Sequence, residues 1–362
     1  MSSSHRMPFI DALKALASQL IVLHHLAFYG PLSDQAQELA PGLISWLSQN
    51  GRYAVQAFLV IGGFLAARSV APAGLLLARS PLGLLWRRYL KLVTPFLVAV
   101  LVAIASAALA RQLMSHYSIP EWPTTGQVIA HLFLLHGILG YDGLSAGVWY
   151  IAIDFQLFVL FVGVLWLARR VQRPERAGPL PAVLLVGALA VVSLYHFNRN
   201  GDWDNWGIYF FGSYALGIAA CWATDPKRLV GWLLPAAGVV LVALVIDFRP
   251  RIAVALFVAL SLVLARVGGL LEDWPRSRLV SWLGRISYSV FLIHFPVCLL
   301  ISGLFVRFAP PSAWVGAAGV LIAWLGSVLA GALFHRFVET AADRRLLVRL
   351  PAIGAVRNGQ TA

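Results

Sequence analysis

Eleven hydrophobic segments follow one another along the chain, separated by short polar stretches. They cover residues 8–29, 50–68, 88–110, 127–139, 147–168, 180–197, 206–223, 229–247, 251–268, 286–306 and 313–335. All but one approach or exceed the roughly 20 apolar residues that a helix needs to cross a bilayer. The pattern therefore predicts an all-α, polytopic integral membrane protein with about ten transmembrane helices.

The segment 127–139 is the exception, because its length is well short of a crossing. Arginine gathers in the stretches 68–91 and 169–176, which flank this region on either side. Arginine-rich loops are typical of the cytoplasmic face of a membrane protein. Segment 88–110 then leaves the cytoplasm and segment 147–168 returns to it, so 127–139 must begin and end outside. We expect it to form a short re-entrant or interfacial helix.

The remaining basic residues agree with this topology. They gather near 227–228, at 276–285 and in the C-terminal tail, which predicts that both termini are cytoplasmic. The N-terminus lacks a small-residue cleavage site, so the first segment is expected to be a span and not a signal peptide. The chain is thus predicted to consist of one membrane domain, 1–340, and a basic cytoplasmic tail, 341–362.

Composition excludes a soluble globular protein. Hydrophobic residues make up 60% of the chain and charged residues 12%, whereas roughly 25% charged is ordinary in soluble proteins. The net charge of +13 is confined to loops and the tail, so it is a topology signal and no nucleic-acid partner is expected. Cys221 and Cys298 both lie inside apolar segments, where they are expected to be buried and unpaired.

Three ionisable side chains inside the predicted spans are candidates for chemistry, because such residues are costly in lipid. Lys14 and His25 are eleven residues apart, which places them within about 20° on one helix face and about 16 Å apart along the axis. Asp11 lies one turn before Lys14, whereas His24 points roughly 80° away. Asp154 is placed about two turns below the outer end of its span, at the depth expected for His25. We therefore predict that Asp154 contacts His25 and orients it as a general base.

Each of these residues also has a plain structural explanation. Lys14 and His25 could extend to the two membrane interfaces, and Asp154 could be a structural hydrogen-bond acceptor. No metal site is expected, because His24 and His25 diverge and His131 and His136 would lie about 140° apart on a helix.

Ordered motifs extend over nearly the whole chain. After Asp11, Lys14 and His25 come AVQAFLVIGGFLAARS at 54–69, WRRYLKLVTP at 86–95, VWYIAIDFQLF at 148–158, ISYSVFLIHFPV at 286–297 and HRFVET at 335–340. In this order they resemble the membrane acyltransferase-3 family, bacterial integral-membrane enzymes that O-acylate glycans and other acceptors. Three positions depart from the family pattern: Lys14 replaces an arginine, Gly62 a serine and Asp154 a glutamate.

The resemblance implies an O-acyltransferase of the bacterial inner membrane with acyl-CoA, most often acetyl-CoA, as donor substrate and no permanently bound cofactor. The acceptor would be a hydroxyl of an extracytoplasmic or lipid-linked glycan. His25, Asp154 and Lys14 would be catalytic, while Arg87, Arg88, Lys91 and Lys14 would hold the donor phosphates. Substrate or structural support would come from Asp11, Trp149, Gln156, Ser287, Tyr288, His294 and Glu339.

Two other functions fit the same residues. In a proton-coupled secondary transporter, Lys14, His25 and Asp154 would form a proton or substrate pathway. A non-catalytic scaffold in a complex with polysaccharide assembly or export proteins would not need His25 at all.

The charge pattern predicts that residues 111–147 are wholly extracytoplasmic and that residues 69–87 and 169–179 are cytoplasmic. A cysteine introduced at Asp142 should be labelled by a membrane-impermeant thiol reagent in intact cells, whereas one within 169–179 should be protected. Labelling of position 142 from the cytoplasmic side alone would make 127–139 a true span.

Overall fold

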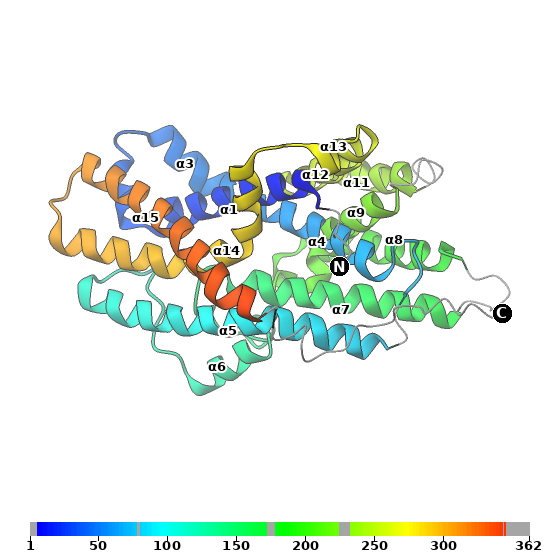
Figure 1. The fold of residues 1–362 in the computed structure, drawn as a ribbon, viewed down its shortest axis with the longest axis horizontal. Helices are drawn as coiled ribbons and strands as arrows, with labels where there is room; N and C mark the ends of the chain where they lie inside the picture. Colours follow the sequence, from blue (N-terminus) through cyan, green and yellow to red (C-terminus); the bar gives the residue numbers. More distant parts are fainter. Residues whose placement is uncertain (1–5, 78–79, 172–177, 224–231, 343, 345–362) are drawn as a thin grey trace.

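The computed structural model describes residues 6–77, 80–171, 178–223, 232–342 and 344, and within these ranges it is helical with no strand (Figure 1). Eight helices or continuous helical stretches are long and apolar enough to cross a membrane. Five are single helices: α1 (Pro8–Tyr29), α5 (Pro81–Leu113), α7 (Val148–Val171), α12 (Pro250–Val267) and α14 (Arg278–Phe308). Two are continuous stretches of several elements: Pro41–Val70 contains α3 (Pro41–Asn50), η1 (Gly51–Ala54) and α4 (Val55–Val70), and Leu180–Arg199 contains α8 (Leu180–Tyr195) and η3 (Phe197–Arg199). The last stretch, Ala313–Ala342, contains α15 (Ala313–Phe334) and η6 (His335–Glu339).

Two shorter apolar helices, α9 (Gly207–Trp222) and α11 (Leu234–Ile246), complete the ten predicted spans. The prediction of an all-α polytopic membrane protein is thereby confirmed. The short elements α2 (Pro31–Ala36), α6 (Thr125–Leu132), η4 (Gly201–Trp203) and α13 (Leu270–Asp273) lie between the longer helices.

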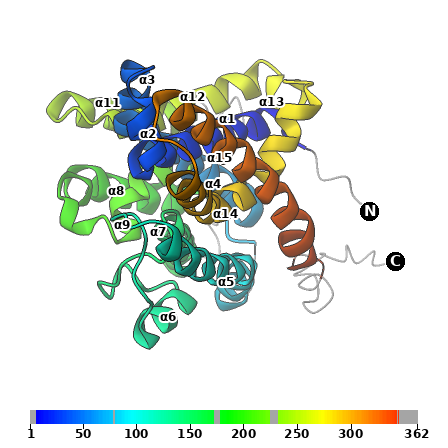
Figure 2. The same cartoon turned by 90° about the vertical axis from the view of Figure 1, so that its left-hand side faces the viewer.

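The long helices run side by side, as both views show (Figures 1 and 2). We call the end of the bundle where α1 begins the proximal end, and the end where α1 stops, beside α2 and α3, the distal end. Most of the predicted tail, 341–362, lies outside the described residues, as do the basic residues Arg79, Arg173, Arg176, Lys227 and Arg228.

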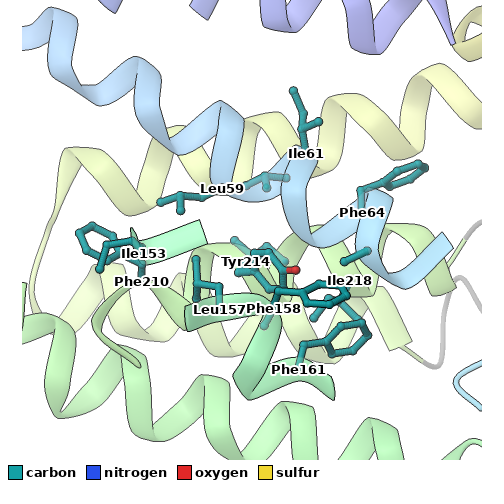
Figure 3. Packing of buried hydrophobic residues seen from close by; sticks show 14 of the residues in the cluster. Leu59, Ile61, Phe64, Ile153, Leu157, Phe158, Phe161, Phe210, Tyr214 and Ile218 are labelled. Atoms are coloured by element: carbon teal, nitrogen blue, oxygen red, sulfur yellow. The ribbon is translucent and has the colours of Figure 1, made fainter. Parts of the chain in front are cut away.

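Helices α4, α7 and α9 pack against one another through large buried side chains (Figure 3). Phe64, Phe161 and Tyr214, one from each helix, are at most 2% exposed. Glycines let α4 and α9 approach closely, since a Cβ on Gly217 would lie only 1.8 Å from the carbonyl oxygen of Val60. Small residues serve this purpose in membrane proteins, where close van der Waals contact replaces the hydrophobic effect between helices.

A second close contact joins α1 to α14. A Cβ on Gly284 would lie 2.2 Å from the backbone oxygen of Asp11. The two helices therefore touch at backbone distance near their proximal ends, which sets how their polar residues are aligned further along.

The segment 125–142 enters the bundle from the distal end and returns to it. Gln127 donates a hydrogen bond to the carbonyl of Asp142 at 2.8 Å, which holds the two ends of the segment together. At its tip, the carbonyl of Leu132 accepts a hydrogen bond from Tyr89, a residue near the proximal start of α5. Ile129 and Phe133 are about half exposed, as expected for side chains that face lipid. The segment is therefore re-entrant.

His131 and His136 lie on the inner side of this segment. Their rings stack with centroids 4.1 Å apart, and both stack on Phe96 of α5. The expectation that they diverge is wrong, because α6 ends at Leu132 and the helical geometry does not continue to His136. Among the described residues, no group of three His, Cys, Asp or Glu side chains could hold a metal ion.

Gly217→Ala should destabilise the protein, because its Cβ has no room against α4. Overpacking of this kind typically costs about 1–3 kcal/mol, which a lower unfolding temperature in detergent would report. Gly163→Ala on α7 is the matched control, since nothing lies within 4 Å of its Cβ position. Equal melting of the two variants would show that the contact between α4 and α9 does not limit stability.

Candidate active site

A cavity of about 250 Å³ lies near the proximal end, and we call it the proximal cavity. It brings together residues from all six motifs of the sequence. Its lining includes seven of the predicted site residues: Lys14, Arg88, Lys91, Asp154, Ser287, Tyr288 and Glu339. Three of them are cations and two are carboxylates, so charged groups gather in a cavity whose wall is otherwise largely apolar. Arg87 is not among the lining residues.

The strongest interaction in this cavity is an ion pair between α5 and α7. Arg88 Nη2 donates to Asp154 Oδ2 at 2.5 Å, and the Asp154 side chain is only 8% exposed. The Nε of Arg88 is buried and has no hydrogen-bond partner among the described residues. A buried charge is tolerated only when it is paired, so the Asp154 carboxylate requires Arg88, whose side chain is 31% exposed.

The predicted contact between Asp154 and His25 is therefore wrong. The physical reason is the position along the bundle axis at which α7 begins. Gly147, just before α7, packs against Phe291 of α14, because a Cβ on Gly147 would lie 3.1 Å from the carbonyl oxygen of Phe291. His294, which binds His25, lies three residues distal to Phe291, and Asp154 lies seven residues proximal to Gly147. At 1.5 Å per residue, His25 and Asp154 are roughly 15 Å apart along the helix axes.

His25 is instead paired with His294 of α14. His25 Nδ1 lies 2.6 Å from His294 Nε2, and the two rings stack with centroids 4.9 Å apart. His294 Nδ1 lies 2.8 Å from the carbonyl oxygen of Phe291, which can only accept, so this nitrogen carries a hydrogen. In a neutral pair, His294 Nε2 must then accept from His25 Nδ1–H. His25 Nε2 is left as an unprotonated nitrogen able to act as a base.

His24 belongs to a different contact. Its Nδ1 lies 3.0 Å from the carbonyl oxygen of Leu47 at the end of α3. The prediction that His24 and His25 point in different directions is confirmed by these separate partners. His25 faces α14 and His24 faces α3.

His24 and His25 line a second cavity of about 650 Å³, which we call the histidine cavity. Phe291 lines the histidine cavity and the proximal cavity alike. It packs against Tyr150, with ring centroids 5.4 Å apart, and against Phe58 at 6.2 Å. These three aromatic side chains form a thin apolar layer between the two cavities.

A third cavity, of about 760 Å³, lies at the distal end and is here called the distal cavity. It shares Tyr29, Ala146 and Trp149 with the histidine cavity. The three cavities thus follow one another through the bundle. The histidine cavity is the middle one, and His25, paired with His294, stands in its wall.

Three of the residues predicted to give substrate or structural support make contacts that stabilise the fold. Gln156 accepts a hydrogen bond from the backbone of Gly207 at 2.7 Å and so ties α7 to the start of α9. Asp11 pairs with Arg6 at 3.1 Å. Glu339 accepts from Ser289 at 2.5 Å and lies 3.0 Å from His335 Nδ1, within a π-helical turn of the kind often found at functional sites.

Sequence reasoning missed four aromatic residues at the site. Phe58, Tyr150 and Phe291 stand inside recognised motifs, but an apolar ring in an apolar span carries no separate signal. Tyr214 has a buried hydroxyl without a hydrogen-bond partner among the described residues. Its ring lies 3.4 Å from the Cβ position of Gly62, and Asp154 Oδ1 lies 3.5 Å from the same point. A serine at position 62, usual in the family pattern, would place a hydroxyl there.

The fold and these cavities, which carry charged and polar side chains, define a multi-pass membrane protein with a site inside its helical bundle. The acyltransferase-3 family model, described as an acyltransferase domain, matches residues 7–335. The chain therefore belongs to this family and is a membrane acyltransferase. No curated protein and no solved structure matches it.

The buried ion pair makes a prediction about stability. Arg88→Gln should lower the free energy of unfolding by about 3–5 kcal/mol, because it leaves the buried Asp154 charge alone. Asp154→Asn should cost less, because the Arg88 side chain that it leaves unpaired is 31% exposed. The double variant should lose clearly less than the sum of the two, which thermal unfolding in detergent can measure.

Arg6→Gln is the matched control. Arg6 also pairs with a carboxylate, but its side chain is 48% exposed, so the loss should stay below about 1 kcal/mol. Additive effects of Arg88→Gln and Asp154→Asn would mean that the two charges do not depend on each other.

Proposed function

We propose that this protein moves a small acyl group, of acetyl size, from acyl-CoA in the cytoplasm to a hydroxyl of an extracytoplasmic or lipid-linked glycan. The membrane would be the bacterial inner membrane, with the proximal end and both termini on the cytoplasmic side. One observation carries the proposal: the His25 and His294 pair stands beside a cavity between the proximal cavity and the distal cavity.

The donor would enter the proximal cavity. Its volume of about 250 Å³ is below the roughly 300–1,000 Å³ of sites for drug-sized ligands, so it suits the slender pantetheine arm and not the nucleotide. The nucleotide phosphates would stay at the mouth, near the exposed Lys91 and the preceding Arg87. Arg88 is already engaged by Asp154, so any donor contact would use its remaining N–H groups.

His25 would act as the general base. The acceptor hydroxyl gives its proton to His25 Nε2 while its oxygen bonds to the thioester carbonyl carbon. The bond between carbon and sulfur then breaks, and the departing sulfur takes the proton from the His25 imidazolium. The acyl ester and free CoA are the products.

His294 would be a positioning residue in this scheme. Its Nε2 accepts from His25 Nδ1–H, and its own Nδ1 is held by the Phe291 carbonyl. This chain of hydrogen bonds would fix the tautomer of His25. From the sequence alone, this role was predicted for Asp154. Hydrogen bonds in a chain also polarise one another.

The aromatic layer favours a small acyl group. A thioester coming from the proximal cavity has to pass Phe291, Tyr150 and Phe58 to reach His25. A short acyl chain needs only a side-chain rotation there, whereas a bulky one would need the helices to separate.

A proton-coupled transporter is the second candidate, favoured by the ion pair in the wall of the proximal cavity and by the further cavity at the other end of the bundle. In that case Arg88 and Asp154 would be the coupling residues, and solute movement would not require acyl-CoA. Labelled acetyl groups on surface glycans, formed only when the protein is present, would decide for transfer.

His25→Ala should abolish acyl transfer while acyl-CoA still binds. Loss of a general base typically lowers the rate by about 10² to 10⁴. Mass spectrometry of surface glycans would report transfer, and binding of acetyl-CoA to the purified protein would report the donor site. His24→Ala is the control and should retain most of the activity, because His24 faces α3.

His294→Ala should lower the rate, and His294→Gln should restore part of it, since the glutamine side-chain oxygen can accept from His25 Nδ1–H. Normal transfer in His25→Ala would rule out this mechanism. Equal losses in both His294 variants would mean that His294 serves packing alone.

A further inference from the structure

The distal cavity has the size of a ligand site and leads to His25. At about 760 Å³ it lies within the roughly 300–1,000 Å³ usual for small-molecule sites. Its wall shares Tyr29, Ala146 and Trp149 with the histidine cavity. A molecule held here could therefore extend one group toward His25.

Aromatic rings stand open at the edge of this cavity. Trp122 is 67% exposed, and Trp149 and Tyr141 are each more than a third exposed. Trp122 is held in place, because the guanidinium of Arg111 lies 4.3 Å from its ring centroid while Arg111 also donates to the carbonyl of Pro120. Rings carry negative charge on their faces, which suits the weakly positive C–H groups on the flat side of a pyranose sugar.

Short polar side chains lie among these rings. The lining includes Glu121, Asp142 and Asn205. Carboxylates accept hydrogen bonds and amides both donate and accept, so together they can satisfy the neighbouring hydroxyls of one sugar ring. A cavity for a lipid chain would have no use for these groups.

The charge of the lining is the most informative feature. Glu121 and Asp142 contribute two negative charges, and no lysine or arginine lines the cavity. The proximal cavity differs, because the three cations in its wall, Lys14, Arg88 and Lys91, outnumber its two carboxylates. Arg111 does not line the cavity, and its guanidinium is engaged by the Trp122 ring and the Pro120 carbonyl. Like charges repel across a binding surface, so an anionic ligand is disfavoured at the distal end.

We propose that the distal cavity is the acceptor subsite and that it selects an uncharged pyranose over an acidic sugar, with Trp122 and Trp149 as stacking platforms and Glu121 and Asp142 as the charge filter. This assignment rests on the proposed acyl transfer for its role, but sugar binding itself can be measured without any donor.

The test is binding of uncharged methyl pyranosides with the gluco, galacto and manno configurations to the full-length protein in nanodiscs, by saturation-transfer NMR. The matched acidic probe for each is the uronic acid, in which a carboxylate replaces the exocyclic CH₂OH. At least one uncharged sugar should bind at least tenfold more tightly than its uronic acid. Glu121→Gln combined with Asp142→Asn should reduce this preference severalfold.

Trp122→Ala and Trp149→Ala should each weaken sugar binding at least tenfold. Trp314→Ala is the matched control, because Trp314 is 77% exposed and does not line the cavity. His25→Ala should bind the sugar normally, so a loss of transfer with intact binding would count against the catalytic scheme alone. The subsite is overturned if none of the uncharged sugars binds, if the acidic probes bind equally well, or if both tryptophan variants bind as the wild type does.

Discussion

The buried ion pair between Arg88 and Asp154 is the interaction on which the arrangement of this site depends. The Asp154 side chain is only 8% exposed, and leaving such a buried charge unpaired costs several kcal/mol. The pair therefore holds α5 and α7 in one alignment, with the N-terminal part of each helix facing the other. It also keeps Asp154 in the wall of the proximal cavity, so the carboxylate is not available to His25. Tyr214 and Gly62 lie next to it and complete a polar centre inside an otherwise apolar core.

The histidine pair depends on a different constraint, the close contact of α1 with α14. Gly284 allows the backbones to touch, and from that point the two helices run together until His25 meets His294. An imidazole in this position replaces the carboxylate that accompanies histidine in many hydrolases. It can fix the tautomer of His25 but adds no negative charge, which suits a site surrounded by apolar side chains. The backbone carbonyl of Phe291 supplies the last acceptor of the chain.

The three cavities give the two ends of the bundle different chemical character. Cations outnumber carboxylates in the lining of the proximal cavity, whereas the distal lining has two carboxylates and no lysine or arginine. For an acyltransferase that takes a polyanionic donor from one side and an acceptor from the other, this difference would keep each substrate at its own end. The aromatic layer of Phe58, Tyr150 and Phe291 stands between them. A thin apolar layer would also hinder water from crossing, which protects a thioester from hydrolysis.

The sequence by itself determined the elements of this protein, because the length and apolarity of a helix that spans lipid are properties of contiguous residues. It predicted the ten spans, the re-entrant segment from its short length and its flanking arginines, and the different directions of His24 and His25, which follow from helical geometry. Only the tertiary structure decided the partners. Asp154 pairs with Arg88 and His25 with His294, because the height of one helix against another depends on close contacts such as Gly147 with Phe291 and Gly284 with Asp11. Contacts between residues far apart in the chain leave no periodic pattern in the sequence. The stacking of His131 on His136 could not be predicted either, because the helix that would have separated the two rings ends at Leu132.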